Sequence, residues 1–159
     1  MYIQLMAAEV TLKTRPGNSL FELPCACQNL RRLTRVVSRM YDEELRKAGL
    51  EVTQFGLLTA LATTGETNQK RLAAGLAMDS TTLTRTLSLL RKQGWVHVRH
   101  GEDRRERLFR LTPAGERQLT AAQPYWERAE HRLRRELGDG GWKNMTGAMF
   151  RLTHAALKA

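Results

Sequence analysis

The chain of 159 residues contains only two cysteines, Cys25 and Cys27, with a single residue between them. A disulfide framework needs more cysteines at wider spacing, so a small secreted protein held together by disulfides is excluded. We expect both thiols to be reduced, as is usual in the cytoplasm.

Long hydrophobic runs are also missing. No stretch of about 18 or more apolar residues occurs, which excludes an ordinary membrane-spanning helix. The first residues lack the basic start, the unbroken apolar core and the small-residue cleavage site of a secretory signal. The sequence therefore predicts a cytoplasmic protein.

The patterns that catalysis requires are absent as well. An enzyme needs a nucleophile, a base and an acid that converge, or a metal cluster of carboxylates and histidines. The sequence has no HExxH pair and no glycine-rich phosphate loop, and its four histidines are scattered. We therefore predict that the protein is not an enzyme and needs no cofactor. The histidines are His97, His100, His131 and His154.

Acidic residues are scarce relative to basic ones, with 16 Asp and Glu against 26 Lys and Arg. The resulting net charge of +10 favours an anionic partner, and nucleic acid is the first candidate. The alternative is a basic surface that only keeps the protein soluble. The distribution of the charge along the chain has to decide between them.

Helical periodicity is first sustained over residues 28–47, where apolar residues alternate with arginines at helical spacing and Gly49 ends the pattern. Residues 1–24 show no such period, and we predict an N-terminal arm there. Thr53 is a candidate N-cap for a short helix so rich in apolar residues that most of it should be buried.

Two short helices with a tight break between them come next. Asn68 is a good N-cap for the first and Asp79 for the second, which predicts a helix-turn-helix over 68–93. The residues near the start of such a second helix reach base edges and phosphates in the major groove of DNA. The alternative is that its hydroxyl residues only cap the helix. The candidate DNA-binding residues are Ser80, Thr81, Thr82, Thr84 and Arg85.

Residues 95–111 form two alternating segments around a charged tip, which predicts a β-hairpin, or wing. Between residues 91 and 110, seven basic side chains stand against three acidic ones. An arginine at a hairpin tip can enter the minor groove, and a nearby aspartate can fix the direction of its guanidinium. The alternative is that the charged residues of the tip are only solvated and do not bind DNA. The candidate residues are Asp103, Arg104 and Arg105.

After the hairpin, Thr112 with Pro113 at the first helical position opens a long helix that "GDGG" ends near residue 138, and a last helix runs to the C-terminus. The terminal helices carry more apolar surface than one chain can bury, which favours a dimer.

The segments "LTRTLSLLRKQGWV", "DRR" and "LTPAG", in this order and spacing, resemble the multiple-antibiotic-resistance-regulator (MarR) family of bacterial transcription factors. The resemblance implies a mainly α fold: a winged helix-turn-helix with a two- to three-stranded β-wing and long N- and C-terminal helices that form a dimerisation region. It implies one domain over 25–159, with dimerisation helices at 25–48 and 113–157.

By the same resemblance, Ser80 to Arg85 correspond to the start of the recognition helix. Asp103 and Arg105 correspond to the acidic residue and the minor-groove arginine of the wing, and Arg104 would meet backbone phosphate. The implied function is a homodimeric transcriptional regulator, a repressor that binds double-stranded DNA at an inverted repeat and is released by a small ligand or an oxidant. A structural or RNA-binding winged-helix module is the alternative of a different class.

Cys25 and Cys27 stand at the start of the first long helix, where the helix dipole and Arg31 favour a thiolate. They are candidate redox sensors, and the alternative is that they pack in the dimer interface. A metal-sensing winged-helix repressor, with these thiols and His97 or His100 as zinc or copper ligands, is a further alternative. A ligand cleft lined by Trp95, His97 and Arg31 also stays open, although core packing is the other role for Trp95.

Overall fold

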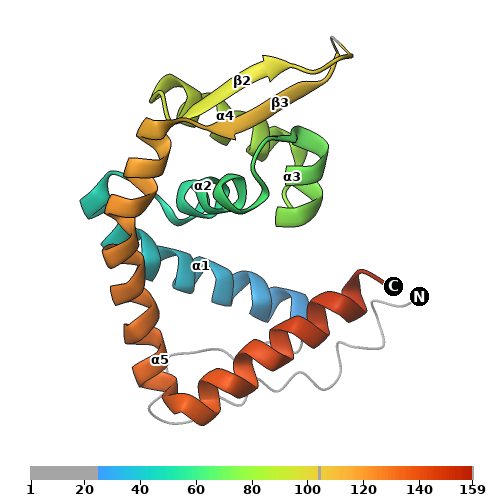
Figure 1. Ribbon diagram of the computed structural model, residues 1–159. Helices are drawn as coiled ribbons and strands as arrows, with labels where there is room; N and C mark the ends of the chain where they lie inside the picture. The colour runs from blue at the N-terminus through green and yellow to red at the C-terminus, as the bar shows by residue number, and fades with distance from the viewer. Residues whose placement is uncertain (1–24, 104, 159) are drawn as a thin grey trace. The chain divides into compact units, whose positions relative to one another are not determined.

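The computed structural model describes residues 25–103 and 105–158 (Figure 1). The predicted N-terminal arm and Arg104 lie outside these residues. The contacts of the chain define two compact units with their boundary between Ser38 and Arg39, inside the first helix. None of the helices in the described part of the chain is long and apolar enough to cross a membrane.

Helix α1 (Ala26–Leu45) continues into a short 3-10 helix, η1 (Arg46–Ala48). Gly49 follows with a φ of 73°, in the left-handed region that favours glycine, so the predicted end of this helix is confirmed. Leu30, Leu33 and Val36 of α1 have exposed side chains, whereas Tyr41 and Leu45 are buried in the larger unit.

Helix α2 (Val52–Thr64) is the most buried helix of the larger unit: Leu57, Leu58 and Leu61 are at most 1% exposed. The sequence predicted that most of this helix is buried, whereas the structure buries four of its thirteen residues, all of them apolar, and exposes five. The predicted cap Thr53 is wrong. Glu51 is the N-cap, because the Gln54 side chain accepts the Glu51 backbone N–H at 3.0 Å in a capping box.

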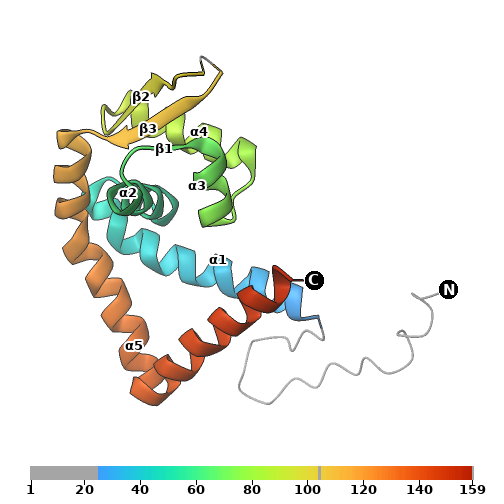
Figure 2. The same ribbon diagram turned by 45° about the vertical axis from the view of Figure 1, so that its right-hand side comes forward.

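Helices α3 (Gln69–Leu76) and α4 (Ser80–Lys92) form a helix-turn-helix that packs on α2 (Figure 2). The predicted caps are confirmed, since Asn68 accepts the Arg71 N–H and Asp79 accepts the Thr82 N–H, each at 2.9 Å. Ala77 makes the sharp turn between the helices with a φ of 49°. The inward side of both helices supplies the core residues Leu72, Leu83, Leu87 and Leu90.

The wing is part of a three-stranded antiparallel sheet with the order β1-β3-β2. Strands β2 (Val96–His100) and β3 (Arg107–Leu111) form the predicted hairpin, and the short β1 (Thr67–Asn68) pairs with β3 on its other edge. Buried Val96 and Phe109 attach this sheet to the core. The fold is therefore mainly α with a three-stranded wing, as predicted.

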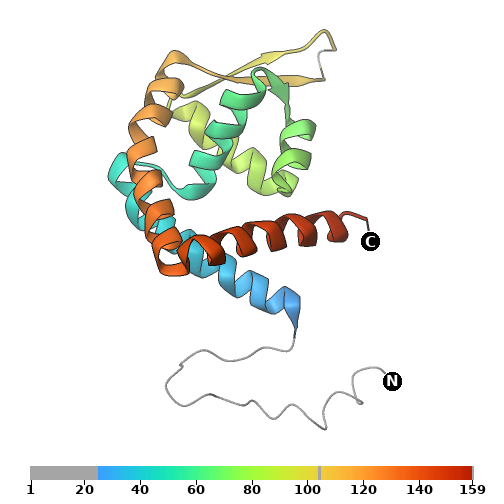
Figure 3. The ribbon, with the colours of Figure 1, turned by 60° about the horizontal axis from the view of Figure 1, so that its bottom comes forward.

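Helix α5 (Pro113–Ala156) is two helical segments that meet at Gly138, where φ is 66° and ψ is 167°. The predicted break in "GDGG" is confirmed, and Figure 3 shows the bend. The first segment packs on α2 and the end of α1 within the larger unit: the Trp126 ring stacks on Phe55 at 5.9 Å between centroids, and Tyr41 donates a hydrogen bond to Glu130. Burial is the largest cause that raises the pKa of Tyr41, and the hydrogen bond to Glu130 is the second.

The corner between β3 and α5 explains the "LTPAG" motif. Thr112 caps α5 by accepting the Gly115 N–H at 3.0 Å, and its hydroxyl donates to the Gly94 carbonyl at 2.7 Å. A Cβ at Gly115 would lie 2.2 Å from the carbonyl oxygen of Trp95, which is half-buried beside it. Glycine is therefore required for α5 to approach the backbone of Trp95, just before β2, so closely.

We expect Gly115→Ala to lower the free energy of unfolding by about 1–3 kcal/mol or more, because the clash is with backbone that cannot rotate away. Chemical denaturation measures the change. Gly75→Ala in α3 is the matched control, since its Cβ would meet nothing within 4 Å, and it should be neutral or stabilising. Equal effects of the two substitutions would contradict this account of the corner.

Candidate nucleic-acid interface

The outer face of α4 carries most of the residues that the sequence singled out. Ser80, Thr81, Thr84 and Arg85 line one shallow groove of about 700 Å³, together with Ser88, Leu89 and Lys92. All of these side chains are exposed. Thr82 is exposed as well, but it is engaged by the capping residue Asp79 and does not line this groove.

Asp79 fixes the start of this helix through hydrogen bonds to Thr82, first to its side chain and then to its backbone, and these bonds hold the pKa of the Asp79 carboxyl below its usual value. The first N–H groups of a helix carry a partial positive charge. The ionised carboxylate stabilises that end of α4 and sets the position of Ser80 and Thr81, which follow it directly.

The Thr84 hydroxyl also has two hydrogen-bond partners within the protein. Its hydroxyl donates to the Ser80 carbonyl at 2.7 Å and accepts from the Gln69 side chain at 2.6 Å. Because the hydroxyl proton is used within α4, this conformation leaves Thr84 able to accept a further hydrogen bond but not to donate one to a phosphate. Thr84 therefore couples α4 to the start of α3.

The wing tip is shaped by its acidic residues. Asp103 accepts the backbone N–H of Arg105 at 2.8 Å, and the Asp103 carbonyl accepts the Glu106 N–H at 2.9 Å. The sequence predicted that Asp103 holds the Arg105 guanidinium, whereas the contact in the structure is to the Arg105 backbone. An aspartate in a turn commonly accepts the backbone N–H of the residue two positions later. Arg105 itself is exposed.

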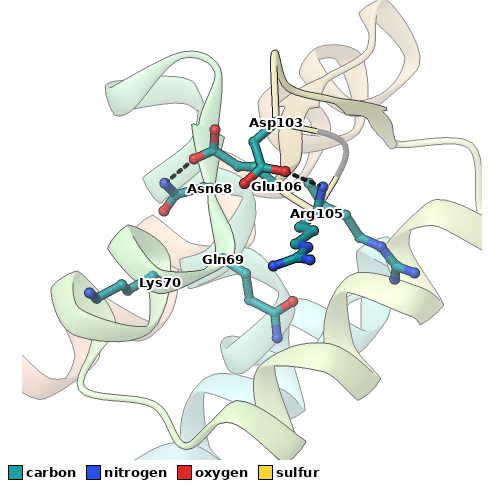
Figure 4. Close-up of a pocket in the computed structure, with 7 residues that line it drawn as sticks. Asn68, Gln69, Lys70, Asp103, Arg105 and Glu106 are labelled. Carbon is teal, nitrogen blue, oxygen red and sulfur yellow. Dashed lines mark hydrogen bonds between the residues drawn. The ribbon is translucent and has the colours of Figure 1, made fainter.

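A second groove, of about 810 Å³, lies between the wing tip and the start of α3 (Figure 4). Glu106 closes one side by accepting a hydrogen bond from the Asn68 amide at 2.6 Å. Sequence reasoning missed this contact, since nothing in the pattern places residues 68 and 106 side by side. The lining residues are Asn68, Gln69, Lys70, Asp103, Arg105, Glu106 and Arg107.

Not every basic residue of the wing is available to a ligand. Arg99 makes two hydrogen bonds to Glu66 at the end of the α2–β1 connection, one of them 2.8 Å from Nε to Oε2. The Arg99 side chain holds the pKa of Glu66 below its usual value through these bonds. Arg99 therefore attaches β2 to the connection between α2 and β1.

The remaining predicted residues are not among those that line the two grooves. Cys25 precedes α1 and Cys27 lies in its first turn, and both thiols are free and exposed. Within residues 25–103 and 105–158, no group of three or more histidine, cysteine, aspartate or glutamate residues is arranged to hold a metal ion. The ligand cleft and the sensing role of the thiols stay predictions.

Comparison with known proteins agrees with this geometry. A sequence model of the MarR family matches residues 48–106. The chain is similar to MosR, a transcriptional regulator of M. tuberculosis crystallised with DNA, with 34% identity, a TM-score of 0.76, and coverage of 84% of this chain and 97% of MosR. The chain belongs to the MarR family.

Two further relatives extend the comparison. YwoH of Bacillus subtilis (strain 168), described as an uncharacterized HTH-type transcriptional regulator, is 37% identical over 83 residues, which cover 52% of this chain and 61% of YwoH. MarR of E. coli shares the fold, with 20% identity, a TM-score of 0.66, and coverage of 82% and 98%. This MarR-family chain is thus a transcriptional regulator with a DNA-binding fold.

We expect the Asp79 cap to make part of the stability depend on pH. A carboxyl with a lowered folded-state pKa contributes stability above its unfolded value, here 3.8, and loses it as the pH falls through the folded value. Asp79→Ala should therefore be less stable than the wild type at neutral pH, and the difference should shrink below pH 3.8. Urea unfolding from pH 7 to pH 2.5 measures this.

Asp79→Asn is the control, because asparagine caps a helix without a charge. The difference in the free energy of unfolding between Asp79→Asn and Asp79→Ala should not depend on pH. A wild-type advantage that is constant down to pH 2.5 would show that the charge of Asp79 contributes nothing.

Proposed function

We propose that this MarR-family protein is a homodimeric repressor that binds a specific inverted repeat in double-stranded DNA. The observation that carries the proposal is the Gln69–Thr84 hydrogen bond. Gln69 lines the groove under the wing and Thr84 lines the groove on α4, so the bond joins the two grooves into one surface. A recognition helix and a wing tip that border one surface suit the adjacent grooves of a DNA duplex.

The charges along this surface favour a polyanion. Five cationic side chains line the two grooves, while the carboxylates of Asp103 and Glu106 are occupied by N–H donors of the protein. Ser80 and Thr81 add exposed hydroxyls, and Arg85 has the donor geometry for guanine. That MosR was crystallised with DNA supports the same function here. The cations are Lys70, Arg85, Lys92, Arg105 and Arg107.

The exposed apolar residues of the terminal helices support a dimer. Leu30, Leu33 and Val36 in α1 are 40–50% exposed, and Phe150 in α5 is 75% exposed. A second copy would cover these side chains, with 25–48 and 113–157 as dimerisation helices of a single domain. Two recognition helices related by a two-fold axis would lie roughly 34–36 Å apart, which calls for an inverted repeat.

The test is to select a preferred duplex from a random pool and to measure binding to it by fluorescence anisotropy. Phosphate-dominated binding with six to ten contacts should lose about 10³–10⁵ in affinity between 50 and 200 mM salt. Arg105→Ala should weaken binding by about 1–3 kcal/mol, because the wing loses its contact in the minor groove.

Arg91→Ala is the matched control, since Arg91 is exposed on α4 but lines neither groove, and its effect should be much smaller. Affinity that does not change with salt would contradict DNA binding through phosphates. Displacement by unrelated duplex or RNA as effective as by the selected site would instead indicate a nonspecific or RNA-binding module. If Arg105→Ala bound the selected duplex with the affinity of the wild type, the wing would have no part in DNA binding.

Release from DNA is proposed to follow binding of a small ligand or oxidation of Cys25 and Cys27. Peroxide converts two thiols into a disulfide and two waters, and a bridge between the two subunits avoids the strain of a bridge between residues so close in a helix. Mild peroxide should therefore release the wild type from DNA and leave a Cys25→Ser, Cys27→Ser double variant bound. Release of the double variant by peroxide would rule these thiols out as the sensor.

A further inference from the structure

Leu89 is an exception among the exposed apolar residues. Its side chain is 43% exposed, whereas the other large apolar residues exposed in the described ranges lie in α1 or from Leu137 onward. The proposed dimer therefore offers no reason for an exposed leucine at this point. Leu89 lies instead on the outer face of α4, in the groove that begins at Ser80.

The neighbours of Leu89 identify its partner. Arg85 is one turn earlier on the same face and Lys92 is one turn later, so the leucine stands between two cations. A partner protein that held α4 in an apolar groove would need anchors at i, i+3, i+4 and i+7. Here the corresponding positions are polar or cationic apart from Leu89. A polyanion with a small apolar group at one point fits this face better.

The major groove of DNA offers one such group, the C5-methyl of thymine. A helix that lies along the groove presents side chains to the bases at i, i+3, i+4 and i+7, which is the spacing of Thr81, Thr84, Arg85 and Ser88, and Leu89 follows Arg85 by one turn. Four residues of helix rise about 6 Å, or roughly two base-pair steps of DNA.

We propose that Leu89 is a specificity-determining residue that packs on a thymine methyl in each half-site, about two base pairs from the guanine read by Arg85. This inference rests on the proposed function and adds a base preference to it. Leu89 offers no hydrogen bond, so its contribution is the burial of one methyl group and the exclusion of water from it.

Single replacement of thymine by deoxyuridine tests the contact, because it removes only the methyl group. In the duplex selected by the wild type, replacement at one thymine position of each half-site should weaken binding about fourfold per half-site, as expected for burial of one methyl group. Leu89→Ala should bind the unmodified duplex more weakly and should bind the thymine and deoxyuridine duplexes equally well.

Two variants complete the experiment. Leu89→Met keeps the apolar volume and should keep the sensitivity to the methyl group. Gln93→Ala, at the exposed C-cap of α4 and outside the groove, should behave as the wild type. Thermal unfolding of Leu89→Ala should match the wild type because this side chain is exposed.

Two results would overturn the inference alone: a selected site in which no thymine methyl affects wild-type binding, or a Leu89→Ala variant with undiminished methyl sensitivity. Failure of the wild type to select any site would overturn the proposed function as well, so the two failures are distinguishable. A change in oligomeric state of Leu89→Ala with unchanged methyl sensitivity would assign Leu89 to a protein contact and also overturn the inference.

Discussion

Asn68 connects the start of α3 to the wing through its side chain and its backbone. Its oxygen accepts the Arg71 N–H and begins α3, its nitrogen donates to Glu106 in the wing loop, and its backbone belongs to β1, which pairs with Leu108 of β3. Both ends of a half-buried amide are thus satisfied by groups from different elements. Together with buried Val96 and Phe109 and the Arg99–Glu66 hydrogen bonds, Asn68 holds the wing against the helix-turn-helix. Gln69 beside it continues the connection to α4 through Thr84.

The acidic residues around this surface act as structural groups. Glu66, Asp103 and Glu106 each accept hydrogen bonds from the protein, two of them from side chains and one from backbone. A carboxylate near a phosphate backbone costs electrostatic energy in DNA binding. Its negative charge is offset here by fixed donors, which keep the hairpin in a defined shape. A fully basic wing would attract DNA more strongly but would hold its tip less firmly.

The apolar side chains fall into a buried group and an exposed group. Inside the larger unit, leucines from α2, α3 and α4 are buried almost completely, which gives a small winged domain a dense core. The terminal helices leave large apolar side chains exposed, and Leu89 does so in the middle of a cationic face. The buried apolar residues stabilise the fold, and the exposed ones indicate surfaces where a partner can bind.

Much of this fold follows from local rules that the sequence displays directly. Asn68, Asp79 and Thr112 cap helices through short-range hydrogen bonds, and Gly49 and Gly138 take backbone angles that favour glycine, so each is visible within a few residues of chain. Thr53 misled the prediction because two neighbouring residues, Glu51 and Gln54, form a better cap together. The order of the motifs was enough to indicate the family.

Contacts between distant residues were decided only by the tertiary structure. Sequence alone gave no means to pair Asn68 with Glu106, Glu66 with Arg99 or Gln69 with Thr84, because such pairs depend on how the sheet register and the helix packing bring separate elements together. The sequence by itself determined the helices, their ends and the excess of positive charge. The tertiary structure decided which polar groups are hydrogen-bonded within the protein and which face of α4 stays exposed, because the hydrogen-bond partners of a polar group depend on its neighbours in space.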